Sequence, residues 1–202
     1  MKKNLIKISI VIIIAFATIN YFNENDEPVY GLVVNGNTID VIDMHLHTGT
    51  WDALTEPYKE RYSERVPKPL KFLMSSLLGN GLTSEGILKQ LDNAGIKRAG
   101  VFAVYSPDTT GNASNEFLYE QIKNHPERMF GFYSIRTDYW NINRDIELKK
   151  LEDDLVKYNS YGIKLAHAHQ QMRLDDKRFD GIYEIAGRLS KPVYIHTGTS
   201  PN

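Results

Sequence analysis

The chain has 202 residues, of which 42% are hydrophobic, and a formal net charge of −1. That length suits one domain with an appendage, and the scattered Lys and Arg residues form no basic face, so we expect no nucleic-acid partner. The sequence contains no cysteine, which excludes disulfides, thiolate metal ligands, a cysteine nucleophile and an acylated-cysteine anchor.

The first 22 residues resemble an export signal or a membrane anchor. Three lysines, Lys2, Lys3 and Lys7, precede an apolar run from Ile8 to Ile19. Within this run, Ala15-Phe16-Ala17 resembles a small-x-small cleavage site. The run is short for a spanning helix, which needs about 20 apolar residues. Extending it from Leu5 through Phe22 allows a retained anchor with cytoplasmic lysines. We therefore expect localisation on the periplasmic or extracellular side, with a cleaved signal and a membrane tether both left open.

Residues 23–40 are predicted to be a polar linker followed by a short hairpin. The turn signal is Asn35-Gly36, which lies between the apolar stretch 29–34 and the stretch 38–44. Asn-Gly is among the strongest short-range hairpin signals. The domain itself is then expected to occupy residues 41–202.

Downstream of the hairpin the sequence alternates between predicted strands and predicted helices. Strands are expected over 41–45, 99–104, 129–135, 162–166 and 193–196. Helices are expected over 83–93, 114–124, 146–158 and 180–189. Residues 48–80 are predicted to be a long irregular loop, rich in aromatic and charged residues.

This alternation implies βαβ units and a parallel sheet. A doubly wound sheet and a (β/α)8 TIM barrel both satisfy it. No glycine-rich phosphate-binding loop follows the first strand, which argues against a doubly wound nucleotide-binding domain. His45, His47 and His196 all follow or end predicted strands, and TIM barrels place functional residues at those ends. The pattern therefore favours an α/β fold of the TIM-barrel type.

His45 and His47 are the candidate metal ligands of the first strand. Residues i and i+2 of a strand point to one face, and catalytic zinc sites typically use three protein ligands and a water. His196 ends the fifth strand and could reach the same barrel mouth, while Asp43 could orient the pair as an outer partner. The alternative is that the pair occurs by chance and that His196 is a hydrogen-bonded core residue.

A second set of candidates follows the fourth strand. Lys164 lies within it, and His167 and His169 come directly after it, so all three could line the barrel mouth or stand at a loop entrance. Trp51, together with Tyr58 and Tyr62, could shape an apolar substrate pocket within the 48–80 segment. Simple packing of that segment explains these aromatic residues equally well.

Several segments, in order, resemble a known superfamily. Residues 42–47, Ile-Asp-Met-His-Leu-His, resemble the first-strand motif of the amidohydrolase superfamily. Five further segments resemble one member of this superfamily, the amidohydrolase-related family. They are residues 125–131, 162–165, 174–176, 183–186 and 192–198. The resemblance implies strands one to five of a (β/α)8 barrel and a divalent ion, zinc or similar, held by His45, His47 and His196. It also implies hydrolysis of amides, esters or lactones of small-molecule substrates, or decarboxylation of aromatic or related acids.

The chain also departs from that family. The family uses a His at the end of strand six and an Asp at the end of strand eight for catalysis, and this sequence stops at Asn202, just past strand five. We therefore expect a fragment, a truncated product or one piece of a larger assembly, with a homo-oligomer or a completing chain as partner.

Three rivals to a metal-dependent hydrolase follow. The first is a decarboxylase on the same scaffold. The second is a phosphoesterase of the polymerase-and-histidinol-phosphatase type, whose first motif is similar but whose spacing to residues 192–196 fits less well. The third is a non-catalytic half-barrel that only binds a partner.

Overall fold

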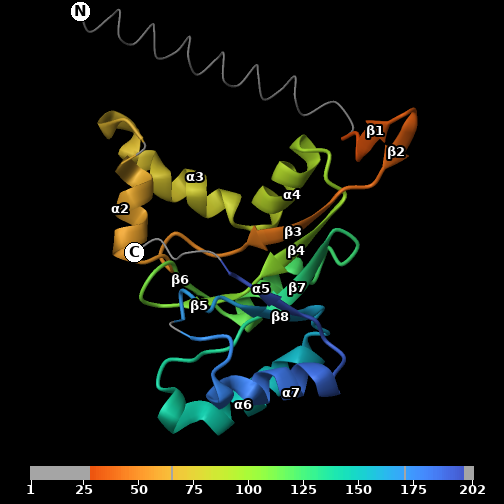
Figure 1. Ribbon diagram of the computed structural model, residues 1–202. Coiled ribbons are helices and arrows are strands. Elements are labelled where there is room, and N and C mark those ends of the chain that lie inside the picture. The colour runs from red at the N-terminus through yellow and green to blue at the C-terminus, as the bar shows by residue number, and fades with distance from the viewer. Residues whose placement is uncertain (1–27, 65, 171, 198–202) are drawn as a thin grey trace, which may run out of the picture.

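The computed structural model describes residues 28–64, 66–170 and 172–197. Its centre is a five-stranded sheet made of β3 (Ile42–His47), β4 (Arg98–Phe102), β7 (Met129–Tyr133), β8 (Gly162–Leu165) and β9 (Val193–Ile195) (Figure 1). The expected signal or anchor, residues 1–22, lies outside the described residues. In the described ranges no helix combines the length and apolar character that a membrane span requires.

The order of the strands decides between the two expected architectures. Every neighbouring pair is parallel, and the order β3-β4-β7-β8-β9 follows the chain. A doubly wound sheet reverses its strand order at a switch point, whereas a (β/α)8 barrel adds each strand beside the previous one. The sheet therefore corresponds to the first five strands of a TIM barrel, as predicted.

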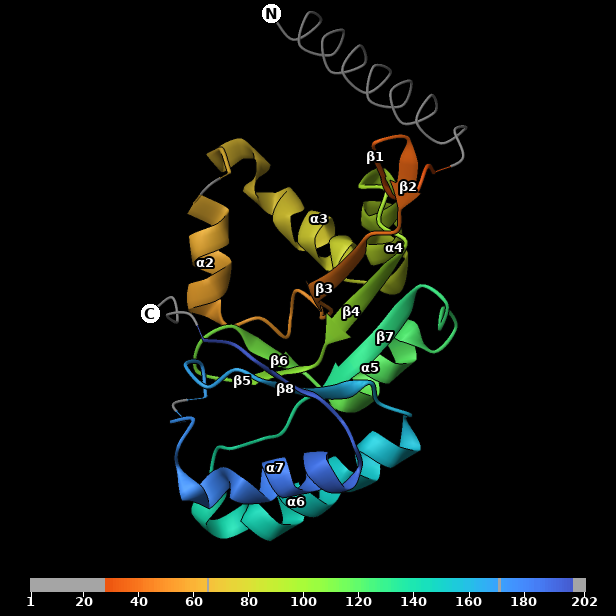
Figure 2. The ribbon, with the colours of Figure 1, turned by 45° about the vertical axis from the view of Figure 1, so that its right-hand side comes forward.

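Helices connect successive strands and cover one face of the sheet. They are α4 (Ser84–Asn93), α5 (Asn115–Ile122), α6 (Trp140–Lys157) and α7 (Asp180–Arg188). The oxygen of Thr83 accepts the Gly86 amide and that of Ser114 accepts the Phe117 amide, which satisfies donors at the helix starts. Figures 1 and 2 show α6 and α7 side by side beneath the sheet, away from α2 and α3.

The main core lies between these helices and the sheet. Its sheet side chains include Val101, Ile163 and Leu165, each completely buried. Helix side chains such as Leu118 and Ile182 pack in the same cluster. Burying each such side chain stabilises the folded state by about 1.5–3 kcal/mol. This layer therefore holds the strands, and with them the side chains at the strand ends, in place.

The N-terminal hairpin forms as predicted. β1 (Leu32–Val34) pairs antiparallel with β2 (Asn37–Ile39). Asn35 and Gly36 both have positive φ, 52° and 79°, which a two-residue type I′ turn requires.

The segment expected to be an irregular loop is largely helical. It contains α2 (Glu56–Glu64), the 3-10 helix η1 (Lys68–Leu73) and α3 (Met74–Gly81). No described residue of α2 is fully buried, so the segment lacks the one-sided apolar periodicity that predicts a helix. The prediction of an irregular loop for residues 48–80 is therefore wrong.

Two further elements depart from the sequence expectations. The hairpin of β5 (Val104–Ser106) and β6 (Gly111–Ala113) was not predicted, and α6 begins six residues before the expected start. Its first residue, Trp140, is buried, donates its indole N–H to the Arg178 carbonyl at 3.0 Å and packs on Phe179. This tertiary contact extends the helix beyond its periodic part.

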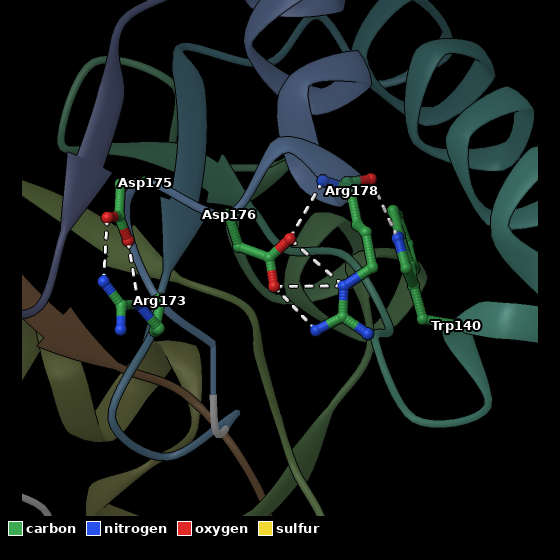
Figure 3. Close-up of polar contacts among 5 residues, drawn as sticks. All are labelled: Trp140, Arg173, Asp175, Asp176 and Arg178. Atoms are coloured by element: carbon green, nitrogen blue, oxygen red, sulfur yellow. Dashed lines mark hydrogen bonds and ion pairs between the residues drawn. The ribbon is translucent and has the colours of Figure 1, made fainter.

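Local ion pairs shape the connection from β8 to α7, which includes η2 (Lys177–Phe179). Figure 3 shows Arg173 on Asp175 at 2.9 Å and Arg178 on Asp176 at 2.6 Å, with Trp140 against the Arg178 carbonyl. Exposed pairs of this kind contribute about 0–1 kcal/mol each. Each pair joins residues two apart in the sequence, so it acts only locally.

Candidate active site

A cavity of about 310 Å³ lies at the carboxyl ends of the strands. His45 and His47 line it from β3, Lys164 lines it from β8, and His196 lines it from the end of β9. His169 joins them from the loop after β8. The structure thus brings five of the seven candidate residues to one cavity, at the end of the barrel where TIM-barrel sites are built.

The two histidines of β3 are held close together. The Nε2 atoms of His45 and His47 lie 3.2 Å apart. The β3–β4 register shifts between Asp43 and Leu46, and such irregularities re-aim side chains beside active sites. The Asp43 carboxylate accepts the His45 backbone N–H at 2.8 Å, so this hydrogen bond holds the backbone of the pair.

The spacing of this pair fits a shared metal ion. Two nitrogens bound at 2.0–2.1 Å to a tetrahedral zinc ion are about 3.4 Å apart, close to the observed separation. His196 lies further away, with its ring 6.5 Å from that of His45. Its Nε2 is buried without a hydrogen-bond partner, a state that a metal ligand without its ion would have. In the part of the chain that the structure describes, no three such side chains converge as a ligand set, so His196 would have to shift to join the pair.

The surroundings favour neutral imidazoles. Burial lowers the pKa of His47 well below its usual range, with further contributions from His45 and Lys164. Burial and then Lys164 lower the pKa of His45 in the same direction. Both residues keep part of their surface accessible from the cavity, so water there reduces these effects. Neutral imidazole is the form that binds metal ions.

Lys164 is buried in the cavity wall with no hydrogen-bond partner. The residue is 2% exposed, and its Nζ lies 4.5 Å from the ring centres of Phe102 and of Tyr194. Burial lowers its pKa to about 8. The two rings give the ammonium a cation–π contact but no hydrogen-bond acceptor.

The second histidine pair divides between two sides of the sheet. His169 lines the cavity, where its Nδ1 lies 3.2 Å from the Thr109 hydroxyl and its ring lies 5.1 Å from that of His196. His167 lies away from the cavity and contacts the Tyr183 hydroxyl through Nε2 at 3.1 Å. The interpretation of His167 as a cavity residue is therefore corrected: β8 ends at Leu165 and a turn follows, so strict alternation stops there.

The segment after β3 covers the cavity with apolar groups. Tyr58 and Tyr62 come from α2 and Leu78 comes from α3. Trp51, predicted to shape the pocket with the two tyrosines, does not line it; Lys59 packs on its ring. Tyr58 and Tyr62 therefore line the cavity and Trp51 does not, and a role of the tyrosines in substrate binding stays a prediction.

Sequence reasoning missed the polar rim formed by the β5–β6 hairpin. Thr110 and Asn112 line the cavity there, and Ser134 lines it directly after β7. Gly111 bridges to Leu54, and a Cβ at Gly111 would lie 2.1 Å from the Ala53 oxygen. Only glycine fits this approach, which ties the hairpin to the covering segment. Of the three missed residues, Ser134 alone carried a signal, because it lies near the end of the predicted strand 129–135.

Comparison with solved structures places this arrangement among TIM-barrel proteins. An uncharacterised TIM-barrel protein from Bordetella bronchiseptica matches with a TM-score of 0.59 and 18% identity, over 81% of this chain and 58% of that one. A 5-carboxyvanillate decarboxylase from Novosphingobium aromaticivorans, complexed with manganese and 4-hydroxy-3-methoxy-5-nitrobenzoic acid, matches with a TM-score of 0.60 and 17% identity, over 87% and 55%. A 4-oxalomesaconate hydratase from Rhodopseudomonas palustris matches at 0.51 and 18%, over 79% and 52%.

These likenesses show the fold. The chain spans between half and three fifths of each of these three structures. No protein-family profile matches the sequence, and no curated protein matches it. The fold agrees with the one implied by the amidohydrolase resemblance.

Proposed function

We propose that this chain forms the metal-binding part of a metal-dependent hydrolase that cleaves amide, ester or lactone bonds of small molecules with a metal-activated water. The observation that carries the proposal is the His45–His47 pair, whose Nε2 atoms lie 3.2 Å apart in a cavity at the strand ends. The motif resemblance and the TIM-barrel fold support the same class of chemistry.

His45, His47 and His196 would hold the ion, which would be zinc or, as in the structurally similar decarboxylase, manganese. When bound, such an ion polarises a carbonyl and lowers the pKa of a bound water to about 7. Phe102 and Tyr194 pack on the His45 ring and fix its orientation.

The other lining residues would orient the substrate and exclude water. Tyr58, Tyr62 and Leu78 cover the cavity. His169, held by the Thr109 hydroxyl, is a proton carrier at the wall. The family's own proton-transfer groups belong to strands six and eight, so we propose catalysis for the complete barrel, whether a continuing chain or a partner chain supplies those strands.

The metal assignment is tested by metal content. Full-length protein is loaded with zinc or manganese, dialysed and measured by mass spectrometry of the metal. We expect about one ion per chain in the wild type and in His125→Ala, whose histidine lies outside the cavity, and a loss of at least tenfold in retention for His45→Ala with His47→Ala. Equal metal retention in all three proteins would reject the site.

Decarboxylation of a small acid on the same scaffold is the second candidate. It is favoured by the unpaired buried ammonium of Lys164 in the cavity and by the likeness to a decarboxylase. Incubating the metal-loaded protein in its native assembly with aromatic acids, esters and lactones separates the two. Carbon dioxide release assigns a decarboxylase, and release of acid from the esters or lactones assigns a hydrolase.

Export is proposed from the sequence alone. Lysines followed by an apolar run in residues 1–22 form the pattern of a signal peptide or an anchor. Intact mass and fractionation of the native protein test it: loss of the first residues indicates a cleaved signal, an intact N-terminus in the membrane fraction indicates a tether, and an intact N-terminus in the cytoplasm rejects export.

A further inference from the structure

The outer face of α6 carries a row of exposed residues spaced three and four apart. This outer stripe consists, in chain order, of Tyr139, Ile142, Ile146, Lys149, Asp153 and Val156. Each of these side chains is between 61% and 79% exposed. Residues spaced in this way lie along one side of a helix. The opposite side of α6 is buried in the core through Trp140, Leu151 and Leu155.

The helices beside α6 leave the outer stripe uncovered. On one side lies α5, whose Asn115 amide donates to the Asp154 carboxylate of α6 at 2.9 Å. On the other side lies α7, whose Arg188 pairs with Glu152 of α6 at 2.8 Å. The helices of a (β/α)8 barrel form an outer ring, so further strands of such a barrel would be added beside β9 and not over α6. The stripe is therefore exposed in the half-barrel and in a complete barrel alike.

The outer stripe is apolar toward both ends and charged in the middle. Ile142 and Ile146 precede the charged positions, and Val156 follows them. The charged positions are Lys149 and Asp153, whose ammonium and carboxylate lie 2.9 Å apart. Single exposed apolar residues are ordinary on a protein surface, but a row of them in heptad spacing is the pattern with which one helix packs on another.

The order of these residues is complementary to itself. In two antiparallel helices related by a two-fold axis, residues at equal distances from the axis face each other. With the axis at the level of residue 151, Lys149 faces Asp153 of the second copy, and Ile146 faces Val156 of the second copy. Each contact occurs twice and joins opposite charges or two apolar groups. A parallel pair would instead place Lys149 on Lys149 and Asp153 on Asp153, where the like charges repel.

We propose that two copies of this chain associate through the outer stripe, with their α6 helices antiparallel about a two-fold axis near residue 151. A lipid surface or an unrelated protein would not require a pattern that matches itself on reversal, whereas a symmetric dimer does. The stripe lies on the outside of the helix layer beneath the sheet (Figures 1 and 2), so the proposal does not depend on the function proposed for the cavity. Contact through one pair of helices is a small interface, so we expect a micromolar Kd.

Sedimentation equilibrium of the full chain at low salt, over a series of protein concentrations, tests the association. We expect a monomer–dimer equilibrium in the wild type. Ile146→Glu places a carboxylate against Val156 of the second copy and should raise the Kd at least about tenfold, because a buried unpaired charge is costly. Leu174→Glu, at an exposed leucine outside α6, is the matched control and should leave the Kd unchanged. A monomer at every concentration, or a dimer that Ile146→Glu does not weaken, would overturn the proposal.

Charge reversal tests the reciprocal ion pairs. Lys149→Asp sets two carboxylates against each other across the interface, and Asp153→Lys sets two ammonium groups against each other, so each should raise the Kd at least about tenfold. The double variant, and an equimolar mixture of the two single variants, restore opposite charges and should return the Kd to within about threefold of the wild type. Lys97→Asp, at an exposed lysine paired with Asp40, is the control for a change in net charge. Single variants without effect, or no recovery in the double variant, would reject the antiparallel pairing.

Disulfide formation reports the orientation of the two helices, because the chain has no cysteine of its own. Positions 146 and 156 lie about 15 Å apart along one helix, whereas the Cα atoms of a disulfide are usually about 4.4–6.8 Å apart. Under mild oxidation we therefore expect a covalent dimer in a mixture of Ile146→Cys and Val156→Cys and little in either variant alone. Equal cross-linking of Ile146→Cys by itself would indicate a parallel or nonspecific contact and would contradict the proposal.

Discussion

The two faces of the five-stranded sheet differ in what they bury. On the helix-covered face, Val101, Ile163 and Leu165 are fully buried among aliphatic neighbours. On the other face, Lys164 lies between Phe102 and Tyr194 with no acceptor for its ammonium. Since Ile163, Lys164 and Leu165 are consecutive, one short strand carries both environments. The first face is built for stability, and the second keeps an unpaired charge, which lowers stability.

The largest effect on stability is expected from truncation on the helix-covered face. Leu165→Ala removes a fully buried side chain and leaves a cavity, so the free energy of unfolding should fall by about 3 kcal/mol. Urea denaturation followed by circular dichroism measures it. Leu174→Ala, at a half-exposed leucine, is the control and should change stability by less than about 1 kcal/mol. Equal losses in both variants would mean that the face is not a packed core.

Replacing Lys164, the neighbour of Leu165, should raise the stability of the folded chain. Lys164→Met keeps the length of the side chain and removes its unpaired charge, so the free energy of unfolding at pH 7 should rise by about 2 kcal/mol. The same denaturation experiment checks the gain. A loss of stability in this variant would show that Lys164 has a partner that compensates for its burial.

The pH dependence sharpens the same comparison. With a folded-state pKa of about 8 and an unfolded value near 10.4, the unfolded chain holds the Lys164 proton that the folded chain has released. The free energy of unfolding of the wild type, relative to Lys164→Met, should therefore rise between about pH 8 and pH 10.5 and be flat below this window. The groups whose pKa is coupled to Lys164 are His45, His47 and His169, which are neutral throughout. A flat difference across the window would contradict the burial of the ammonium.

The smallest effect on stability is expected at the N-terminal cap of α4, one of the helices that cover the sheet. The Thr83 hydroxyl accepts the Gly86 amide at 3.2 Å, so Thr83→Ala should lower the free energy of unfolding by about 1 kcal/mol. Thr83→Ser retains the oxygen and is the matched control. Identical stability of Thr83→Ala and Thr83→Ser would mean that the cap does not contribute.

The helix-covered face was predictable from sequence because its signals are local. Alternating short apolar segments gave the five strands, and Thr83 and Ser114 marked two helix starts that the structure confirms. The His45–His47 pair was predictable because i and i+2 share a face within an extended strand.

The cavity was predictable only in part, because its walls come from tertiary contacts. Residues of α2 cover a mouth that exists only after the sheet forms, so their spacing carries no helical periodicity. His167 and His169 have the spacing of the first pair, but both lie in the turn that follows β8, and the two side chains separate. The unpaired state of Lys164 arises because no hydrogen-bond acceptor lies near its ammonium in the described structure. A sequence motif does not reveal such an absence.

The parallel register of the sheet also has a kinetic consequence. Ala99 pairs with Met129 and Ile163 pairs with Val193, whereas the β3 register joins Ile42 to Arg98, nearly twice as far along the chain. The entropy of closing a loop grows with its length, and non-local pairings slow folding. We therefore expect β3 to dock last, so that the histidine pair takes its place only when the other four strands have already assembled.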